Sequence, residues 1–338
     1  MAQEGADRGR RPTLVDVARL AGVSTALASL ALRGVAGPSE QSRERVLRAA
    51  EELRYRSNAA ASLLARRRSE LVGVTCYLDR GFDADVVERL YVEAAERGLD
   101  VLLSAVTPSR TARQAIRTLA DNRCEAIVCV GSGVVPDDLA DLSERVPIVI
   151  VGAATTAPHV DVVRTPGDAG TALAVRHLVG LGHTDIAHIA GGTGMSADER
   201  RSGYETAMRE AGLADRIRVV EGGPGEADGV RAAERLLDGA PPTAVIAYND
   251  AAAVGVLAAA RAAGLRVPTD LSVVGYDGSR IAALSYVDLT TVAQDIPGLA
   301  AEAVRLADAP HADPAEVPHD VVLAPILIER SSTGPAPR

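Results

Sequence analysis

Short apolar runs alternate with amphipathic stretches through most of this chain, and no other feature constrains its fold as strongly. Strands that alternate with helices along a chain form parallel sheets, so two successive sets of four runs predict two parallel-sheet subdomains. The expected strands are residues 71–77, 101–106, 126–130 and 148–151 in the first set and 186–190, 217–220, 244–247 and 272–275 in the second. Helical periodicity lies near residues 84–97, 110–121, 168–181, 199–211, 228–238 and 250–263.

The first seventy residues carry a different pattern, which predicts three short helices. Thr13 and Asp16 form a T-x-x-D box that can cap a helix, and Gly22 ends that helix. Ser24 can cap a second helix and Ser39 a third. Three short helices around one small core, with a tight glycine turn between the first two, are the plan of a helix-turn-helix domain.

The second of these helices has two distinct faces. Ala28, Ala31 and Leu32 fall on one face and should pack inward. The opposite face carries Thr25, Ala26, Ser29, Leu30 and Arg33. It offers DNA hydroxyls, methyl groups and one guanidinium, so we expect thymine-methyl contacts and hydrogen bonds to phosphates or base edges. The alternative is an apolar helix that is buried in a core and contacts no DNA.

The charge of the chain divides at the same place as the pattern. A net charge of −9 argues by itself against a nucleic-acid partner. Residues 1–70, however, hold 13 arginines against 8 acidic residues, a net charge of +5, and the remaining residues carry −14. A basic head on an acidic body predicts a small phosphate-binding module attached to a domain of another kind.

The sequence favours a cytoplasmic location. No apolar run approaches the roughly 18–20 residues that a membrane span needs, and no apolar segment follows the basic N-terminus as in a secretory signal. Cys76, Cys124 and Cys129 are odd in number and form no C-x-x-C motif. Reduced, structural thiols fit this pattern best.

Motifs for catalysis and cofactors are weak or missing. Residues 192–197 fit G-x-G-x-x-A after a strand, which is a loose match to a dinucleotide-binding turn. His177, His183 and His188 lie five and six residues apart and do not share a face, so we expect structural roles rather than metal binding. No G-x-S-x-G motif is present. We therefore expect no enzyme activity, no cofactor and no metal.

Three segments of the chain resemble the LacI/GalR family of transcriptional regulators. They are DVARLAGVS, ERVLRAAEELRYR and NAAASLLARRRSELVGV, and the resemblance runs from about Thr13 to Arg330. It implies a small all-α helix-turn-helix head and an α/β core of two parallel-sheet subdomains, similar to periplasmic binding proteins. It also implies a homodimer that binds pseudo-palindromic double-stranded operator DNA, with affinity controlled by a small molecule, and we expect a repressor.

The resemblance also implies which residues contact DNA. Thr25, Ala26 and Leu30 match base-reading positions, and Leu30 stands where the family usually has arginine. Ala61 and Leu64 match a hinge helix whose leucine wedges into the minor groove, although an alanine-rich linker helix is the alternative reading. The expected DNA-contacting set is Thr13, Ser24, Thr25, Ala26, Ser29, Leu30, Arg33, Tyr55, Asn58, Ala61 and Leu64.

The expected effector site lies between the two subdomains, beyond the carboxyl ends of the strands. Arg200, Asn249 and Asp277 follow strands of the second subdomain and match the family's effector-contacting residues. Each also has a plainer reading, respectively a surface ion pair, a helix cap and a turn. Tyr77, Asp79 and Phe82 follow the first strand and are expected to line the cleft. The resemblance implies a sugar or a related metabolite as the effector. Gly152 stands where many relatives carry Asp, however, and aromatic residues are scarce, so the ligand need not be a sugar.

These inferences give the following organisation. A flexible N-terminus covers residues 1–12, the helix-turn-helix domain 13–57, the hinge helix and linker 58–70, the core 71–330 and a flexible tail 331–338. The first subdomain takes about 71–163 and 293–321, and the second about 164–292 and 322–330. Two other functions stay open: a solute-binding protein, which would need a signal peptide and no basic head, and an α/β nucleotide-dependent enzyme.

Overall fold

The computed structural model describes residues 12–32, 37–55, 69–131, 136–194, 196–309 and 317–337. The chain divides into two compact units, Met1–Ser69 and Glu70–Arg338, called here the head and the core unit. No single helix among the described residues is long and apolar enough to cross a membrane. The first two helices pass that test only when they are taken together, and they are bent by 100° relative to each other.

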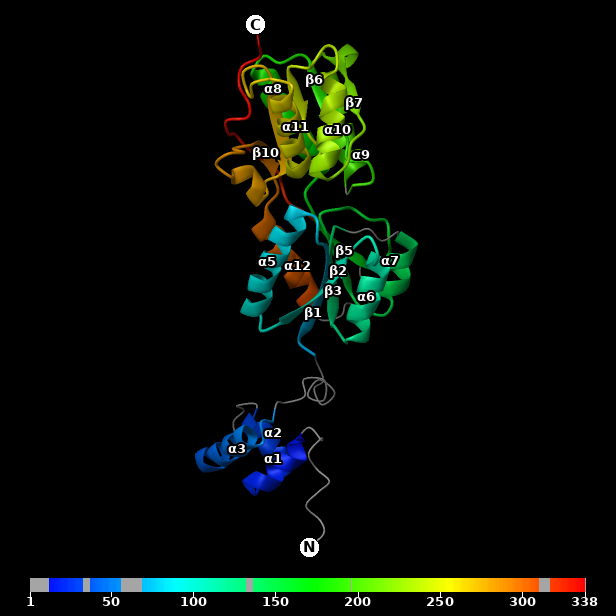
Figure 1. The fold of residues 1–338 in the computed structure, drawn as a ribbon. Helices are drawn as coiled ribbons and strands as arrows, with labels where there is room; N and C mark the ends of the chain where they lie inside the picture. Colours follow the sequence, from blue (N-terminus) through cyan, green and yellow to red (C-terminus); the bar gives the residue numbers. More distant parts are fainter. Residues whose placement is uncertain are drawn as a thin grey trace. The chain divides into compact units, whose positions relative to one another are not determined.

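The head consists of α1 (Leu14–Ala21), α2 (Thr25–Leu32) and α3 (Glu40–Glu52), coloured blue in Figure 1. The predicted capping box is confirmed, because Thr13 N donates to Asp16 Oδ2 at 2.9 Å and Asp16 N donates to Thr13 Oγ1 at 3.4 Å. Gly22 ends α1 in the left-handed conformation, with φ of +66°, which glycine adopts without steric cost. The buried residues that form the core of the head are Val17, Ala18, Ala21, Ala28, Ala31, Val46, Ala49 and Ala50.

The core unit contains two six-stranded sheets, each of which forms one lobe. In lobe 1 every strand pair is parallel, in the order β11-β5-β4-β3-β1-β2. Its strands are β1 (Leu71–Tyr77), β2 (Asp100–Val106), β3 (Ala126–Val130), β4 (Ile148–Val151), β5 (Val160–Arg164) and β11 (Asp320–Val322). Its helices are α5 (Gly81–Glu96), α6 (Ala112–Asp121), α7 (Pro136–Ser143) and α12 (Ile296–Asp308).

Lobe 2 has the same plan, except that one edge strand, β12, is antiparallel to its neighbour. Its strands are β6 (Ile186–Ile189), β7 (Arg218–Val220), β8 (Ala244–Ile246), β9 (Ser272–Asp277), β10 (Thr290–Ala293) and β12 (Ile326–Ile328). Its helices are α8 (Gly167–Gly180), α9 (Ala197–Glu210), α10 (Glu226–Leu237) and α11 (Asp250–Ala262), with short 3-10 turns η1 (Ala214–Arg216) and η2 (Arg280–Ala283).

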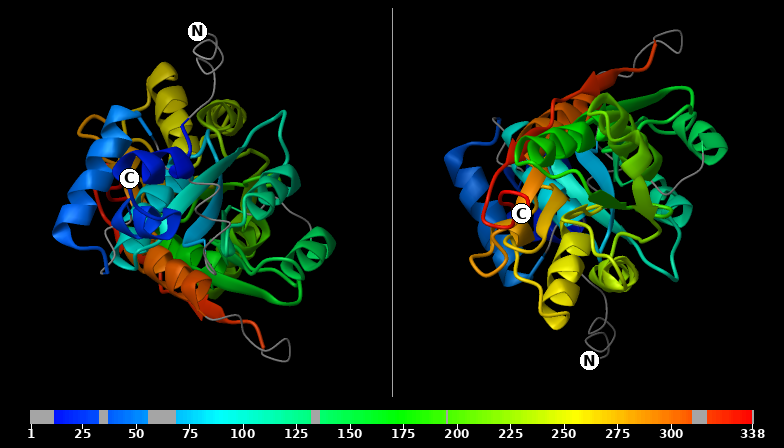
Figure 2. Two further views of the ribbon diagram at one scale, coloured as in Figure 1. Left: turned by 90° about the horizontal axis from the view of Figure 1, so that it is seen from below. Right: turned by 90° about the horizontal axis from the view of Figure 1, so that it is seen from above.

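Helices cover both faces of each sheet, as the two views of Figure 2 show. In lobe 1, α5 and α12 pack on one face and α6 and α7 on the other. In lobe 2, α10 and α11 cover one face and α8 and α9 the other. Because both faces are buried, the strands read as continuous apolar runs, and all eight strands expected from the sequence are confirmed with ends within two residues.

The chain passes between the lobes three times, after β5, β10 and β11. Residues 331–337, expected to be a flexible tail, instead pack against lobe 2. Ser332 is buried, and its hydroxyl donates to the Val273 carbonyl at 2.7 Å and accepts from Thr290 N at 2.8 Å. These bonds join the tail to the neighbouring strands β9 and β10, and the prediction of a free tail was wrong.

Candidate functional site

A cavity of about 300 Å³ lies between the two lobes of the core unit. Lobe 1 contributes one continuous segment, residues 79–85, which covers the end of the β1–α5 connection and the start of α5. Lobe 2 contributes side chains that follow β8 and β9, together with Arg200 from α9. The carboxyl ends of parallel strands open onto this space, which is where α/β folds place their ligands. The volume suits a small metabolite.

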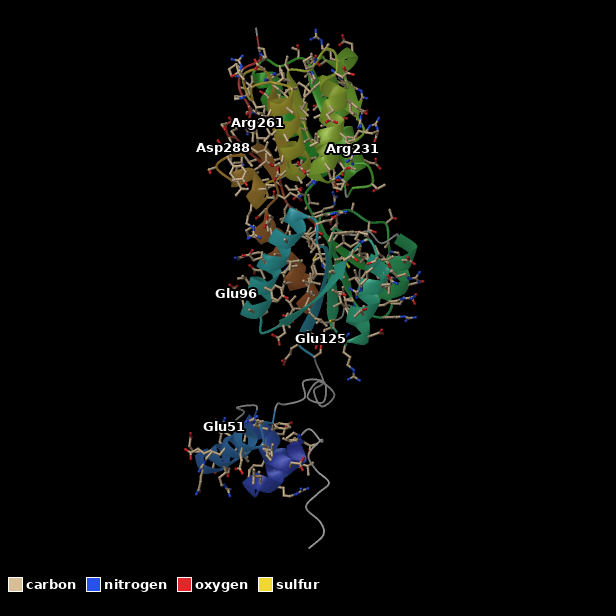
Figure 3. The ribbon with its side chains drawn as sticks, viewed as in Figure 1. Glu51, Glu96, Glu125, Arg231, Arg261 and Asp288 are labelled. Atoms are coloured by element: carbon tan, nitrogen blue, oxygen red, sulfur yellow. The ribbon has the colours of Figure 1, made fainter. Side chains whose placement is uncertain are left out.

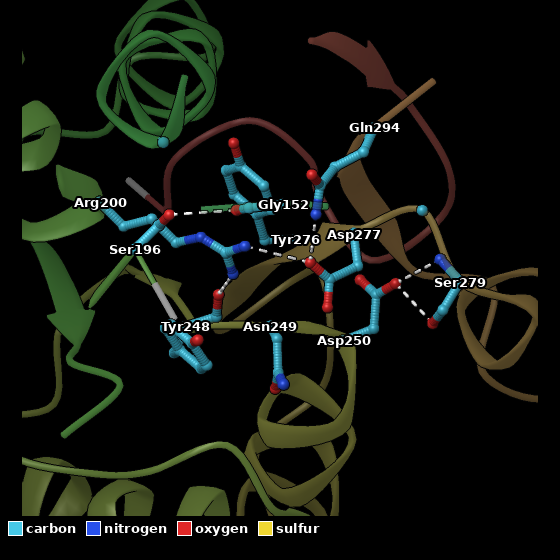
Figure 4. Close-up of polar contacts among 12 residues, drawn as sticks. Gly152, Ser196, Arg200, Tyr248, Asn249, Asp250, Tyr276, Asp277, Ser279 and Gln294 are labelled. Atoms are coloured by element: carbon cyan, nitrogen blue, oxygen red, sulfur yellow. Dashed lines mark hydrogen bonds and ion pairs between the residues drawn. The ribbon is translucent and has the colours of Figure 1, made fainter. Parts of the chain in front are cut away.

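Arg200 is the central side chain of the lobe 2 wall, and it is only 4% exposed. Its Nη1 donates to the Tyr248 carbonyl at 2.6 Å and its Nη2 donates to Asp277 Oδ1 at 3.2 Å (Figure 4). Its guanidinium carbon lies 3.7 Å from the centre of the Tyr276 ring and 4.7 Å from that of Tyr248. Burial alone would lower the pKa of Arg200, but the Asp277 carboxylate reverses this effect and raises it, so the guanidinium stays charged.

The Nε atom of Arg200 is buried and has no hydrogen-bond partner among the described residues. An unpaired, buried donor of a charged group is costly, so it marks a place where an acceptor from outside the chain would lower the free energy. The alternative of a surface ion pair, considered from the sequence, is wrong for Arg200 because its side chain is buried. It pairs with Asp277 at the wall of the cavity.

Asp277 ends β9 with φ of +109°, a conformation that side chains rarely adopt. This backbone, followed by Gly278 at φ of +68°, turns the chain and leaves the carboxylate facing Arg200. Gln294 Nε2 also donates to Asp277 Oδ1, at 2.9 Å. Gln294 follows β10 in the segment that passes to α12 of lobe 1, so a carboxylate that lines the cavity is bonded directly to a connection between the lobes.

Asn249 lines the cavity, but both ends of its amide are already bonded within lobe 2. Its Oδ1 accepts from Ala252 N at 2.8 Å as the cap of α11, and its Nδ2 donates to the Pro224 carbonyl at 3.0 Å. The helix-cap alternative thus describes its bonding in this structure. The adjacent Asp250 is buried and accepts bonds from Ser279 and Thr291. Burial, assisted by the Asp277 charge, raises the pKa of Asp250 to about 7.

Of the three lobe 1 residues that were expected to line the cavity, the structure places two there. Asp79 and Phe82 line the cavity, whereas Tyr77 does not. The Tyr77 ring instead lies beneath the Arg80 guanidinium, 3.8 Å from its carbon. Sequence reasoning missed Asp83, which lines the cavity, is 1% exposed and accepts from Tyr77 N at 2.9 Å. The signal that could have found it is its place in the first turn of the helix that follows β1.

Burial raises the pKa of Asp83 to about 7, although Arg80 opposes the shift. An unfolded aspartate ionises near 3.8, so the buried carboxyl costs stability increasingly between pH 3.8 and about 7 and by a constant amount above that range. We expect Asp83→Asn to raise the Tm relative to wild type at pH 8 and to lose more than half of this advantage by pH 5. Thermal melts of both proteins at the two pH values measure the difference.

Asp79→Asn is the control for this prediction, because it removes a carboxylate from the same segment at an exposed position. An Asp83→Asn effect of equal size at pH 5 and pH 8 would show that Asp83 is not held in its high-pKa state.

In the head, α2 presents the face that the sequence predicted. Ser24, Thr25 and Ala26 are exposed, and Ser29 and Leu30 are half-buried. Ser24 Oγ accepts from Leu27 N at 3.2 Å, which makes Ser24 the cap of α2. Tyr55 packs against the head core. Thr13 caps α1, and four members of the expected DNA-contacting set lie outside the described residues: Arg33, Asn58, Ala61 and Leu64.

The histidines and the glycine loop take structural roles. His183 bonds to Thr243 and to the Gly334 carbonyl, and His188 stacks on Tyr204 inside lobe 2. Burial lowers the pKa of His188 to about 4, so it stays neutral. In the glycine-containing loop, Gly194 packs against the Tyr248 ring. In the described part of the chain, no three His, Cys, Asp or Glu side chains are placed to hold a metal ion.

A helix-turn-helix head followed by a two-lobed α/β core with a cavity between its lobes defines a class, the DNA-binding transcriptional regulators with a ligand-binding core. Comparisons with known proteins specify the family. Residues 13–58 match the profile "Bacterial regulatory proteins, lacI family", and residues 175–333 match "Periplasmic binding protein-like domain". The HTH-type transcriptional regulator GalR of Escherichia coli (strain K12) is 35% identical over 328 residues, which cover 95% of each chain.

Two solved structures are similar over nearly the whole chain. The lac repressor dimer bound to operator and the anti-inducer ONPF has a TM-score of 0.82 at 28% identity and covers 96% of this chain and 100% of its own. The complex of the transcriptional regulator CelR with cellobiose has a TM-score of 0.67 at 30% identity and covers 95% and 100%. The chain belongs to the lacI family of bacterial regulatory proteins and is a DNA-binding regulator rather than an enzyme.

Proposed function

We propose that this chain is a homodimeric, cytoplasmic repressor whose affinity for a pseudo-palindromic operator is set by a small molecule in the cavity between its lobes. The observation that carries the proposal is Arg200, a charged side chain buried at the cavity wall with one unpaired donor. A hydroxyl or carbonyl oxygen of a ligand would satisfy that donor, and the Asp277 carboxylate would accept from a neighbouring hydroxyl.

The ligand that these groups suit is a sugar or a related polar metabolite. Donors and acceptors alternate along a polyol, and the cavity offers both kinds of group. The likeness to the CelR complex supports this class, since that relative binds cellobiose. The cavity of about 300 Å³ and the engagement of the Tyr248 and Tyr276 rings by Arg200 favour a small, hydrogen-bonded ligand over one held by stacking. The proposed contact residues are Asp79, Phe82, Arg200, Asn249 and Asp277.

Operator DNA would be read by the exposed face of α2, with Thr13, Ser24 and Tyr55 beside it and Arg33, Asn58, Ala61 and Leu64 completing the contact set. Genomic fragments captured by the full-length protein, and then sequenced, should share a pseudo-palindrome. Thr25→Glu tests the face directly. An acidic residue is favourable in the first turn of a helix, so the head should stay folded, but its charge would face the phosphates.

We expect Thr25→Glu to abolish the capture of operator DNA. Leu47→Glu is the matched control, because it adds the same charge at an exposed position of α3. Equal capture by Thr25→Glu and wild type would remove α2 from the interface. For the ligand, monosaccharides, disaccharides, their phosphates and nucleosides are screened for an increase in Tm and for an effect on the captured operator. A complete absence of hits in both assays would contradict the proposed effector class.

A further inference from the structure

A charged contact joins the two lobes at the rim of the cavity. Arg280 begins η2 in lobe 2, and its Nε lies 2.5 Å from Asp85 Oδ1 while its Nη1 lies 2.9 Å from Glu88 Oε2. Asp85 and Glu88 both belong to α5 in lobe 1. The backbone N–H of Arg280 also donates to Asp85 Oδ2, at 3.1 Å. One residue of lobe 2 thus brings three donors to two carboxylates of lobe 1.

The position of this contact distinguishes it from an ordinary surface ion pair. Asp85 and Arg280 both line the cavity. The Asp85 side chain is only 11% exposed, although that of Arg280 is 69% exposed. Rotation of the lobes away from each other would pull the guanidinium off α5 and return the Asp85 carboxylate to water. The contact therefore joins the lobes in the arrangement of this structure, and opening of the cleft would break it.

The residue before Arg280 is hydrogen-bonded to the lobe 2 wall of the cavity. Ser279, its neighbour, donates from both N and Oγ to Asp250 Oδ2 at 2.8 Å. Asp250 is the first residue of α11, directly after Asn249. The turn that carries Arg280 also begins three residues after Asp277, so a ligand held by Asn249 and Asp277 would fix the backbone that presents Arg280 to α5.

We propose that Arg280 is a positioning residue that holds the two lobes closed over the ligand through Asp85 and Glu88 and thereby sets the balance between the closed and open forms. The inference rests on the proposed ligand-responsive cleft and concerns its regulation. Exposed ion pairs shift equilibria by only about two- to fivefold. A shift of that size is measurable here because two conformations of a regulator commonly differ by a few kcal/mol or less.

The distance between one residue of each lobe reports the balance directly. Glu96 on α5 and Arg261 on α11 are exposed and lie on the same side of their lobes (Figure 3). Spin labels on cysteines at these two positions give the distance distribution by electron–electron resonance, and the three native cysteines are buried. Full-length labelled chain is refolded with an excess of unlabelled chain, so that only distances within one protomer are counted. No ligand is added.

We expect Arg280→Gln to move the closed-to-open ratio about two- to fivefold toward the longer distance. Asp85→Asn should move it in the same direction by a smaller amount, because Glu88 still pairs with Arg280. The double variant should move it no further than Arg280→Gln, because that change already breaks both pairs. Arg280→Lys should recover part of the shift. Arg231→Gln is the matched control, since it removes a similarly exposed arginine from an ion pair, with Asp228, inside lobe 2; it should leave the distance unchanged.

An unchanged distribution in Arg280→Gln, or additive shifts in the double variant, would overturn the proposal. Raising NaCl from about 50 mM to about 1 M supplies an independent check, because an exposed pair is screened. It should shift the wild type toward the open form and leave Arg280→Gln unaffected. Failure of these measurements would not touch the proposed function, since operator capture and ligand screening do not depend on Arg280.

Discussion

Replacing Arg200 by alanine is expected to lower the free energy of unfolding of the core unit by about 3–5 kcal/mol. The side chain is 4% exposed, and its removal leaves the Asp277 carboxylate, 8% exposed, without its only charged hydrogen-bond donor among the described residues. The Tyr248 carbonyl loses its bond to Nη1, and the Tyr276 ring loses the cation above its face. Urea unfolding of the full-length protein, followed by circular dichroism, measures the change.

Two further variants test whether the loss of unfolding free energy comes from the Arg200–Asp277 pair rather than from the removal of any arginine. Arg261→Ala removes an exposed arginine of lobe 2 and should change the unfolding free energy by less than about 0.5 kcal/mol. Arg200→Ala combined with Asp277→Asn should recover part of the lost stability, because the buried charge is then removed with its partner. If Arg200→Ala unfolded at the wild-type urea concentration, the Arg200–Asp277 pair would contribute nothing to the stability of the core unit.

A loss of effector response in Arg200→Ala would combine two effects, a less stable lobe 2 and the loss of a proposed ligand contact. Arg200 has one buried nitrogen, Nε, without a hydrogen-bond partner among the described residues, and its other two nitrogens bond to Tyr248 and Asp277 of lobe 2. A regulator without Arg200 would fail to respond even if the ligand never touched that residue. Arg200→Lys is the more informative change for binding, because it keeps the charge beside Asp277 and removes the fork that supplies Nε.

The sequence predicted most of the fold because burial on both faces leaves a simple pattern. The four strands that were missed do not show it. In β5, Asp161 and Arg164 interrupt the apolar run, and β10 begins with Thr290 and Thr291, whose hydroxyls bond to Arg330 and Asp250. Helix α12 was missed because Pro297 and Gly298 stand in its first turn, where proline is tolerated because the first amides of a helix have no internal partner.

The site was predictable where its residues directly follow a strand, because ligands of parallel α/β sheets bind beyond the carboxyl ends of the strands. Asn249 and Asp277 follow β8 and β9, and the structure places both at the cavity. Pairing across the sequence was not predictable, because Arg200 and Asp277 are 77 residues apart. Tyr248 and Tyr276 read as continuations of apolar strands, and nothing in their neighbours indicated that they enclose an arginine. The contact between Asp85 and Arg280 was not predictable either, because these residues are 195 positions apart.

The second large effect is expected from a glycine that the apolar pattern did not single out. Gly229 lies on α10 where it crosses α11, and a methyl group there would overlap the backbone carbonyl of Ala252. A carbonyl of a helix cannot rotate away as a side chain can, so the two helices must separate. We expect Gly229→Ala to cost about 1–3 kcal/mol or more of the unfolding free energy of the core unit, measured by urea unfolding. Gly255 on α11 meets the Glu226 carbonyl in the same way.

Gly180→Ala is the control for this prediction. Gly180 ends α8 with open space around it, so the added methyl should instead stabilise the protein by about 0.4–1 kcal/mol through the lower entropy of the unfolded chain. The consequence for function follows from what α11 carries. Its N-terminus holds Asn249 and Asp250 at the cavity, and separation of α10 from α11 would displace both. Gly229→Ala should therefore weaken ligand binding as well as folding. An unfolding midpoint equal to that of wild type would mean that the crossing has room for a methyl group, and that these two glycines do not set the distance between the helices.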